Sequence, residues 1–429
     1  MFNARSFTRL IQGTALAALL GASPASAVDL EFYFPVAVGG AAADLVQALT
    51  NEYMAQTPDV KITPIYAGTY VETMTKTLTA ARGGNPPPLS MVGAVNVFTL
   101  LDEGLIEPFE DVMPAAEAKA WFDGFLPAYV NDAMVDGKHY GVPFQRSTPV
   151  MYWNKAAFKE AGLDPEVPPA TWDEMVEMGK KLTKKDANGN VTRWGVRIPT
   201  AGFPYWLFQG LTTPAGALLA SADGKTTYFD APEVVQSLEY LVKLSKVDGI
   251  MAPGTIDWGA TPKAFFEGES AIIWTTTGNL TNIRTNAPFD FGVAMLPAKK
   301  QRGAPTGGGS FFLFKDASKE QKTAAVAFLH WLTAPKQAAR WSMETGYVAP
   351  SYAAWETDAM KAYVADFPAA LVAKEQLQYA VPELATYDNS RVTQILNAAL
   401  EAAVVGQKTP EQALKDAQAE ADAILAAYR

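Results

Sequence analysis

The hydrophobic positions of this chain form short apolar runs that alternate with longer stretches of helical periodicity. Residues 30–34 are mostly apolar, residues 41–57 have a helical pattern, and residues 60–65 alternate with a period of two. A second helical stretch at 71–82 leads to another apolar run near 89–95. This strand–helix–strand–helix–strand order predicts a parallel, three-layer α/β unit.

The segment at 141–172 indicates a passage from this unit into a second one. An extended run bends at Ser147-Thr148-Pro149, and a short helix at 155–161 ends before a glycine suited to a left-handed cap. Thr171, three residues before Glu174, predicts a capping box at the start of the next helix.

The remaining pattern again mixes strands and helices, which favours two α/β lobes of ordinary domain size. Strands are expected at 191–196, 271–274, 291–296 and 311–314, and helices at 205–211, 232–246, 261–267, 319–333, 336–345, 392–404 and 410–428.

The N-terminus has the pattern of a secretory signal peptide. Arg5 and Arg9 precede an apolar run at 10–20, and Ala25-Ser26-Ala27 follows as a small-residue cleavage site. The run is shorter than the ~20 residues of a membrane span. We therefore expect residues 1–27 to be removed, the mature protein to lie in a bacterial periplasm, and no stable insertion into the membrane.

Composition narrows the classes of function. The formal net charge of the 429 residues is −10, and it becomes −12 without residues 1–27, which carry two arginines and no acid. An acidic protein is a poor candidate for binding nucleic acid. The chain has no cysteine and only two histidines, and it lacks the common catalytic motifs. We expect no enzyme activity, cofactor or metal, with a secreted carboxylate-dependent hydrolase as the remote alternative.

Three segments offer contacts for an anion, and each also has an ordinary structural explanation. Gly307-Gly308-Gly309-Ser310 could present backbone N–H groups as an anion nest or form a flexible loop or strand entry. The hydroxyls at 275–277, before a predicted helix, suit a phosphate or simple capping. Arg391 near a helix start favours an anionic ligand or an ion pair with Asp388.

With these residues assembled, the chain resembles the periplasmic solute-binding proteins of ABC importers, family 1, which includes maltose-binding protein. Within that family it is most similar to the subfamily that binds sn-glycerol-3-phosphate. The motifs that carry the resemblance are Tyr152-x-Asn154-Lys155, Ala161-Gly162-Leu163, Phe266-x-Gly268-Glu269 and Thr345-Gly346-Tyr347, with Tyr66-x-Gly68-x-Tyr70, Ser147-Thr148-Pro149-Val150, Asn282-Ile283-Arg284 and Lys408-Thr409-Pro410 pointing to the subfamily.

The resemblance implies an α/β, two-lobed periplasmic-binding-protein fold of type II, with each lobe a three-layer α/β/α unit. The N-terminal lobe would comprise residues 28–146 and 306–347, and the C-terminal lobe residues 147–305 and 348–429. Hinge crossings are expected at 143–148, 298–306 and 346–351. Such a protein, expected to be a monomer, would close on a small phosphorylated polyol and deliver it to the subunits of an inner-membrane ABC permease.

The resemblance also implies a set of ligand-binding residues. They are Tyr70, Ser147, Thr276, Gly308, Tyr347 and, for the phosphate, Arg391.

Two positions depart from the family pattern. Ala94 stands where the family has a glutamate that binds glycerol hydroxyls, and the apolar Phe34-Pro35-Val36 replaces a polar segment. The expected ligand is therefore sn-glycerol-3-phosphate or, better, a larger organophosphate such as a glycerophosphodiester. A receptor of the same fold for an uncharged sugar or oligosaccharide is the main alternative.

Overall fold

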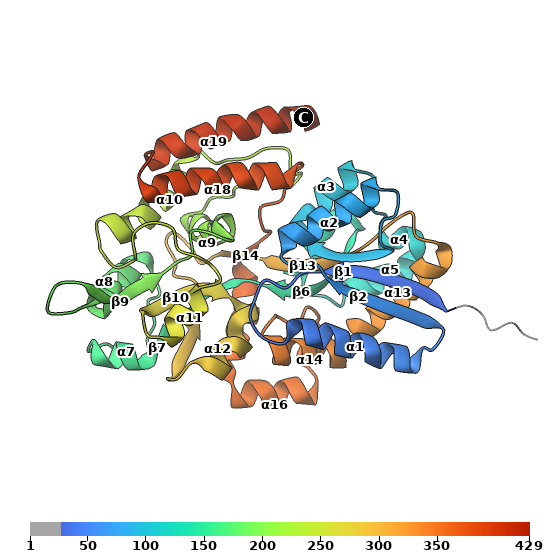
Figure 1. The fold of residues 1–429 in the computed structure, drawn as a ribbon, viewed down its shortest axis with the longest axis horizontal. Helices are drawn as coiled ribbons and strands as arrows, with labels where there is room; N and C mark the ends of the chain where they lie inside the picture. The colour runs from blue at the N-terminus through green and yellow to red at the C-terminus, as the bar shows by residue number, and fades with distance from the viewer. Residues whose placement is uncertain (1–26) are drawn as a thin grey trace, which may run out of the picture.

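The computed structural model describes residues 27–429 as two α/β lobes that lie side by side (Figure 1). The predicted signal peptide lies outside the described residues, apart from its last residue. The sheet of the first lobe has the strand order β2-β1-β3-β13-β6, in which β1 is parallel to β2 and β3, and β13 is antiparallel to β3 and β6. Its strands are β1 (Val28–Phe34), β2 (Val60–Tyr66), β3 (Leu89–Gly93), β6 (Gly141–Ser147) and β13 (Gly307–Leu313).

Helices cover this sheet because their apolar faces match its buried side chains. The helix α1 (Ala42–Gln56) buries Leu45 and Leu49 in the same core as Phe32 of β1 and Phe328 of α13 (Lys319–Leu332). The other helices of this lobe are α2 (Tyr70–Arg82), α3 (Val97–Asp102), α4 (Phe109–Val112), α5 (Ala115–Phe122), α6 (Pro127–Val130) and α14 (Pro335–Thr345), with short 3-10 turns η1 (Ala94–Asn96) and η2 (Asn131–Ala133). A small hairpin joins β4 (Met134–Val135) to β5 (Lys138–His139).

The second lobe is built on a sheet of order β11-β7-β10-β9-β8. Its core gathers Trp172, Trp274 and Phe208, which are almost fully buried. The strands are β7 (Pro149–Asn154), β8 (Lys184–Lys185), β9 (Val191–Arg197), β10 (Ser270–Thr276) and β11 (Phe291–Ala294); the helices are α7 (Lys155–Glu160), α8 (Trp172–Leu182), α9 (Pro204–Ala215), α10 (Pro232–Lys246), α11 (Thr261–Phe266), α12 (Leu280–Asn286), α18 (Asn389–Val405) and α19 (Pro410–Leu425), with η3 (Thr277–Asn279) and η6 (Ala426–Tyr428).

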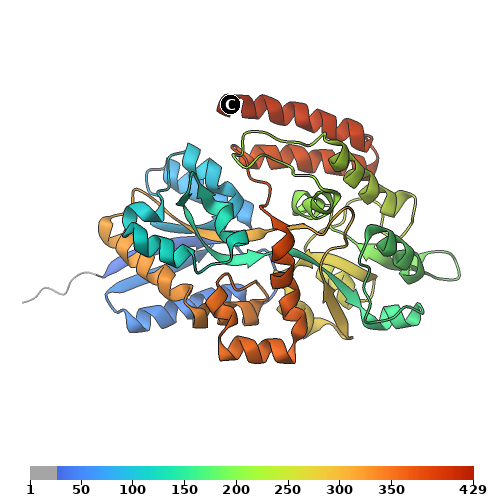
Figure 2. The same ribbon diagram turned by 180° about the vertical axis from the view of Figure 1, so that it is seen from behind.

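A helical segment at 352–379 lies across the junction of the lobes, as the view from behind shows (Figure 2). Trp355 packs with Tyr129 and Ala338 of the first lobe, whereas Ala370 packs with Tyr152 of the second. The segment contains α15 (Tyr352–Trp355), α16 (Asp358–Asp366), η4 (Pro368–Ala370), α17 (Leu371–Gln376) and η5 (Leu377–Tyr379).

The fold agrees with the predicted α/β pattern. The glycines at 307–309 begin β13, with a shift in register after Gly309, so the strand entry is the alternative that is observed for them. Two local differences remain. The predicted strand near 89–95 ends at Gly93, where η1 begins. At Thr171 the hydroxyl accepts from the Glu174 N–H, but the Glu174 carboxylate accepts from the Ala170 N–H, so the capping box is incomplete.

The chain passes between the lobes at three places that are hydrogen-bonded to one another. Thr148, between β6 and β7, donates to the Pro305 carbonyl and accepts from Gln376, which also donates to the Pro149 carbonyl. The Val348 N–H donates to the Arg146 carbonyl over 2.8 Å. Beside them β12 (Ala304–Pro305) pairs with β14 (Ala380–Val381). The crossings thus form one connected layer between the lobes.

A buried ion pair lies beneath this layer. Arg146 of β6 bonds Asp132 of η2, and the two side chains are 0% and 4% exposed. The guanidinium also donates to the Gly308 carbonyl of β13, and the second Asp132 oxygen accepts from Thr306. The pair therefore connects β6, β13 and the crossing at Thr306.

Replacing Asp132 with alanine is expected to destabilise the protein by about 3–5 kcal/mol, because it leaves the Arg146 charge buried without a partner. Urea unfolding measures this difference. The matched control is Asp388→Asn, which removes the charge of the exposed pair with Arg391 but suits the positive φ of 45° at this position, and it should change stability by about 0–1 kcal/mol. Equal stability of the two variants would contradict the assigned role of the buried pair.

Candidate ligand-binding site

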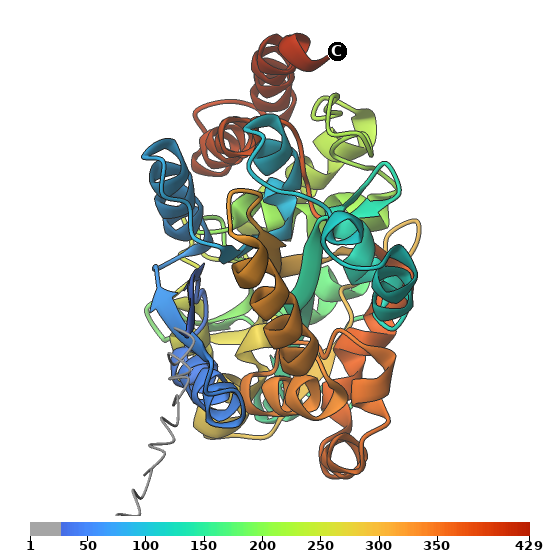
Figure 3. The ribbon, with the colours of Figure 1, turned by 90° about the vertical axis from the view of Figure 1, so that its right-hand side faces the viewer.

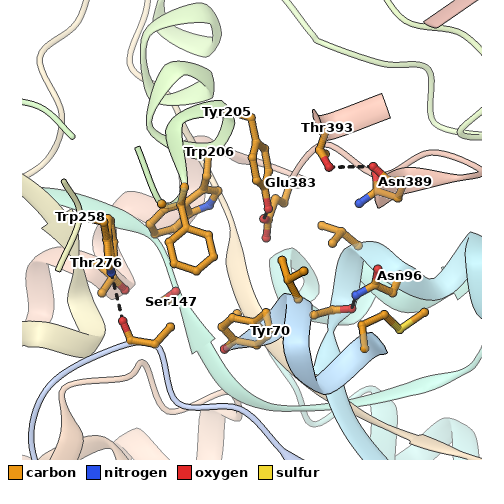
Figure 4. Close-up of a pocket in the computed structure, with 18 of the residues that line it drawn as sticks. Tyr70, Asn96, Ser147, Tyr205, Trp206, Trp258, Thr276, Glu383, Asn389 and Thr393 are labelled. Carbon is orange, nitrogen blue, oxygen red and sulfur yellow. Dashed lines mark hydrogen bonds between the residues drawn. The ribbon is translucent and has the colours of Figure 1, made fainter. Parts of the chain in front are cut away.

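A cavity of about 360 Å³ lies between the lobes and is lined by residues of both (Figure 4). Its walls come from the ends of strands and the starts of helices: β6, β10 and β13 contribute single residues, and α2, α9 and α18 begin beside it. Seen from the side, α18 and α19 lie above the sheets, with their N-terminal connection descending toward the crossings (Figure 3).

Five of the six residues implied by the resemblance line this cavity. They lie on five different segments and are Tyr70, Ser147, Thr276, Gly308 and Tyr347. The topology brings them together because all five lie at or near the ends of strands or helices that face the junction. Their contact with a ligand stays a prediction.

The two tyrosines and Ser147 lie on the floor of the cavity. Gln145 donates to the Tyr70 hydroxyl over 2.7 Å, and burial raises the pKa of Tyr70 to about 12. Burial likewise raises the pKa of Tyr347 well above its usual value. Both phenols therefore stay protonated at neutral pH and can donate a hydrogen bond. Ser147 ends β6 and is 3% exposed.

Two glycines, Gly278 and Gly308, leave room for close packing around the cavity. A side chain at Gly278 would lie about 3 Å from the Tyr347 ring. At Gly308 the φ angle is +96°, and a Cβ would lie 2.0 Å from the Gln145 carbonyl oxygen, so only glycine fits. Thr276 lies beside them, and its hydroxyl accepts from the Gly278 N–H. The simple capping explanation for this threonine therefore holds, although the residue also faces the cavity.

Arg391, the sixth predicted residue, is not among the residues that line the cavity. Its guanidinium pairs with Asp388 at 2.8 Å, and its side chain is 65% exposed. The cause is the way α18 is turned about its axis. Ser390, Gln394 and Asn397 of α18 face the cavity, whereas Arg391 directly follows Ser390 and is rotated by about 100° from it. The ion-pair alternative is the one observed.

The aromatic wall of the cavity was missed by the sequence reasoning. Phe203, Tyr205 and Trp206 enter from the start of α9, and Trp258 comes from the loop before α11. The Phe203 and Trp258 rings meet edge to face at 5.3 Å, and Phe203 approaches Tyr70 of the other lobe at 6.4 Å. The cluster at 203–206 is visible in the sequence, but apolar rings at that spacing are typical of any core helix.

Glu383 was also missed, and it is the one acidic or basic side chain that lines the cavity within residues 27–429. Its carboxylate accepts from the Tyr205 hydroxyl over 2.6 Å. Burial raises the pKa of Glu383 to about 8, although the residue keeps a partly exposed edge toward the cavity. No sequence motif surrounds this residue, so only the fold could identify it.

The polar part of the wall is made of amides and hydroxyls. Asn96 donates to the Gly93 carbonyl, and Thr393 of α18 donates to the Asn389 carbonyl (Figure 4). Asp388 precedes α18 without capping it, because its carboxylate pairs with Arg391. The first turn of α18, with Asn389 and Ser390 facing the cavity, therefore carries the partial positive charge of a helix N-terminus.

The two departures from the family pattern lie behind the wall. Ala94 is 1% exposed, and its neighbours Val95 and Asn96 face the cavity instead. Phe34 is buried in the core of the first lobe, and the cavity is lined by Ala37 and Val38 farther along. The apolar replacement thus contributes to packing of the lobe, not directly to the cavity.

Contacts across the cavity hold the lobes together. The Trp258 indole donates to the Ala37 carbonyl over 3.0 Å, which is drawn as a dashed line in Figure 4. At the opposite end, Tyr428 donates to Asp102 over 3.2 Å, and Phe98 packs on Tyr387. The lobes therefore touch at two ends of the cavity.

Comparison with known proteins places this arrangement in a family. The model for bacterial extracellular solute-binding proteins matches residues 48–369. The sn-glycerol-3-phosphate-binding periplasmic proteins of Shigella dysenteriae serotype 1 and Escherichia coli K12 are each 32% identical to the chain over 388 residues, which is 87% of this chain and 87% of theirs.

Solved structures of similar proteins agree with this family assignment. The UgpB protein of Mycobacterium tuberculosis in complex with glycerophosphocholine is 25% identical, covers 94% of this chain and all of its own, and has a TM-score of 0.81. The cyclic alpha-maltosyl-1,6-maltose binding protein of Arthrobacter globiformis is also 25% identical, with a TM-score of 0.77 over 93% of this chain and 99% of its own. Within residues 27–429 no helix is long and apolar enough to cross a membrane. The chain belongs to the bacterial extracellular solute-binding proteins of ABC transporters, with the two-lobed fold that was predicted.

Proposed function

We propose that this protein captures a glycerophosphodiester in the cavity between its lobes and delivers it to an ABC permease in the inner membrane. Relatives named for sn-glycerol-3-phosphate and a structural neighbour bound to glycerophosphocholine support the ligand class. The observation that carries the proposal is the composition of the cavity, which joins hydroxyls and a helix N-terminus to an aromatic wall.

Charge favours a phosphodiester over a phosphomonoester. Within residues 27–429 no lysine, arginine or histidine lines the cavity, since Arg391 faces away. A phosphomonoester carries about −1.5 to −2 charges at neutral pH, whereas a diester carries one. Burying a second charge without a cationic partner costs several kcal/mol. The hydroxyls of Ser147 and Tyr347 line the cavity and offer hydrogen bonds to a single negative charge.

The aromatic wall favours a ligand with a second group beyond the glycerol phosphate. Phe203, Trp206 and Trp258 present rings that free sn-glycerol-3-phosphate is too small and polar to cover. The headgroup of a diester would bury this apolar surface.

An uncharged oligosaccharide is the second candidate. Aromatic rings that stack on sugar faces, with amides such as Asn96, Asn389 and Asn397, are typical of sugar sites, and none needs a cation. Hydrolysis is disfavoured, because the relatives are transport receptors and Glu383 has no second carboxyl beside it in the described lining of the cavity.

Titration calorimetry should show glycerophosphocholine binding at least about tenfold more tightly than sn-glycerol-3-phosphate, because only the diester matches the single charge and the aromatic wall. Trp206 and Trp258 line the cavity, so tryptophan fluorescence gives an independent measurement. Maltose serves as the control ligand. Tight maltose binding with no binding of either organophosphate would reject the proposal in favour of the sugar receptor.

Arg391→Ala should leave the affinity for glycerophosphocholine within about twofold, because an exposed ion pair contributes little. Ser147→Ala, by contrast, should weaken binding by about tenfold, because the hydroxyl faces the anion site and hydrogen bonds to charged groups are worth about 1.5–3 kcal/mol. Calorimetry on both variants makes the comparison. If the arginine variant lost much of its affinity for glycerophosphocholine and the serine variant lost none, the phosphate would have to bind at Arg391.

Trp258→Phe should weaken ligand binding several-fold, because the closed arrangement loses the indole bond to Ala37, worth about 1 kcal/mol. Small-angle scattering of the ligand-free variant should show a larger radius of gyration than the unsubstituted protein. Trp121→Phe is the matched control, since its indole donates to Thr333 within one lobe. Unchanged scattering and affinity in the Trp258 variant would show that this bond does not favour closure.

A further inference from the structure

Glu383 occupies a position that the binding of glycerol phosphate alone does not explain. Figure 4 shows its carboxyl directed into the cavity, beneath the ring of Tyr205 and opposite Tyr70. The backbone is fixed, because the Glu383 N–H donates to Thr306 and the following Leu384 N–H donates to Gln209. A carboxyl held rigidly in a cavity that takes an anion repels that anion once it is ionised, unless it serves another part of the ligand.

The surroundings of Glu383 are those of a site for a cation. The Tyr205 hydroxyl satisfies Oε1. The Tyr205 and Trp206 rings lie beside the carboxyl on α9, and aromatic faces attract cations such as quaternary ammonium groups. Across the rest of the cavity lining, within the described chain, there is no basic side chain to compete.

We propose that Glu383, with the rings of Tyr205 and Trp206, forms a subsite for a cationic headgroup, an ammonium or trimethylammonium, on the ligand. This inference rests on the proposed function and specifies which glycerophosphodiesters the protein prefers. The phosphate lies toward the hydroxyls of Ser147 and Tyr347, and the headgroup cation lies against the carboxylate. A zwitterionic diester then enters the cavity with no net charge.

Binding of such a cation is coupled to loss of a proton. Because burial raises the pKa of Glu383 to about 8, the carboxyl is mostly protonated at pH 7 in the empty cavity. A bound cation favours the ionised form, so the proton leaves as the ligand enters. The affinity for a cationic diester should therefore rise as the pH increases from 7 to 9, and one proton or slightly less should be released at pH 7.

The other groups that face Glu383 do not produce this pH dependence. They are Tyr205 of α9, Tyr70 of α2, Asp132 of η2 and Arg146 of β6. Burial holds the pKa of Tyr70 at about 12 and that of Tyr205 well above its usual value. Burial raises the pKa of Asp132 only to about 6. The guanidinium of Arg146 is paired with Asp132. Among these groups, Glu383 is therefore the one that changes its protonation between pH 7 and 9.

The test compares two diesters of glycerol phosphate, glycerophosphocholine with a cationic headgroup and glycerophosphoglycerol with an uncharged one. The full protein and its Glu383→Gln variant are titrated with each at pH 7 and pH 9. Glutamine keeps the size of the side chain and an oxygen for the Tyr205 hydroxyl. We expect the protein to prefer glycerophosphocholine by about tenfold or more at pH 9, and the variant to lose most of this preference.

Proton release is measured on the unsubstituted protein by calorimetry in buffers of different ionisation enthalpy, so this result does not depend on folding of the variant. Release with glycerophosphocholine and none with glycerophosphoglycerol supports the subsite. Equal affinity for both diesters without proton release would overturn it while leaving the proposed function intact. Failure of both diesters to bind, with maltose bound, would overturn the proposed function and the subsite together.

Discussion

The buried ion pair between Arg146 and Asp132 is the interaction that fixes the first lobe's side of the crossings. Both side chains are almost completely enclosed, so neither charge can be solvated and each requires the other. The guanidinium also bonds the Gly308 carbonyl, and the carboxylate bonds Thr306. The strands that carry the chain between the lobes are thereby held in one arrangement, directly beneath the cavity.

The position of the cavity follows from this constraint. Ser147 ends the strand that carries Arg146, and Gly308 pairs with Arg146 across the sheet, so both face the junction of the lobes. The second lobe adds the aromatic residues at the start of α9 and the first turn of α18. A ligand in the cavity would contact residues of both lobes, and in two-lobed proteins such contacts favour closure around the ligand.

The cavity residues that could be predicted from the sequence are those whose neighbours constrain the backbone. Gly308 needs a positive φ, and Ser147 sits at a bend before proline, so local sequence and resemblance indicated both. Arg391 lies outside the cavity lining, and a charge near a helix start says nothing about which way that helix is turned. The phase of α18 is set by Val392 and Leu396, which are buried in the core and rotate Arg391 into solvent.

The sequence by itself determined the order of strands and helices, the two α/β lobes and the family, because these depend on hydrophobic periodicity and on local motifs. It also placed the crossing at Ser147 to Pro149. Only the tertiary structure decided which side chains meet in the cavity. Glu383 and Tyr205 are 178 positions apart, yet they share a hydrogen bond because both segments end at the junction of the lobes. The charge of the cavity depends on such long-range contacts, and so does the ligand that we propose. Local sequence patterns do not predict contacts of this kind.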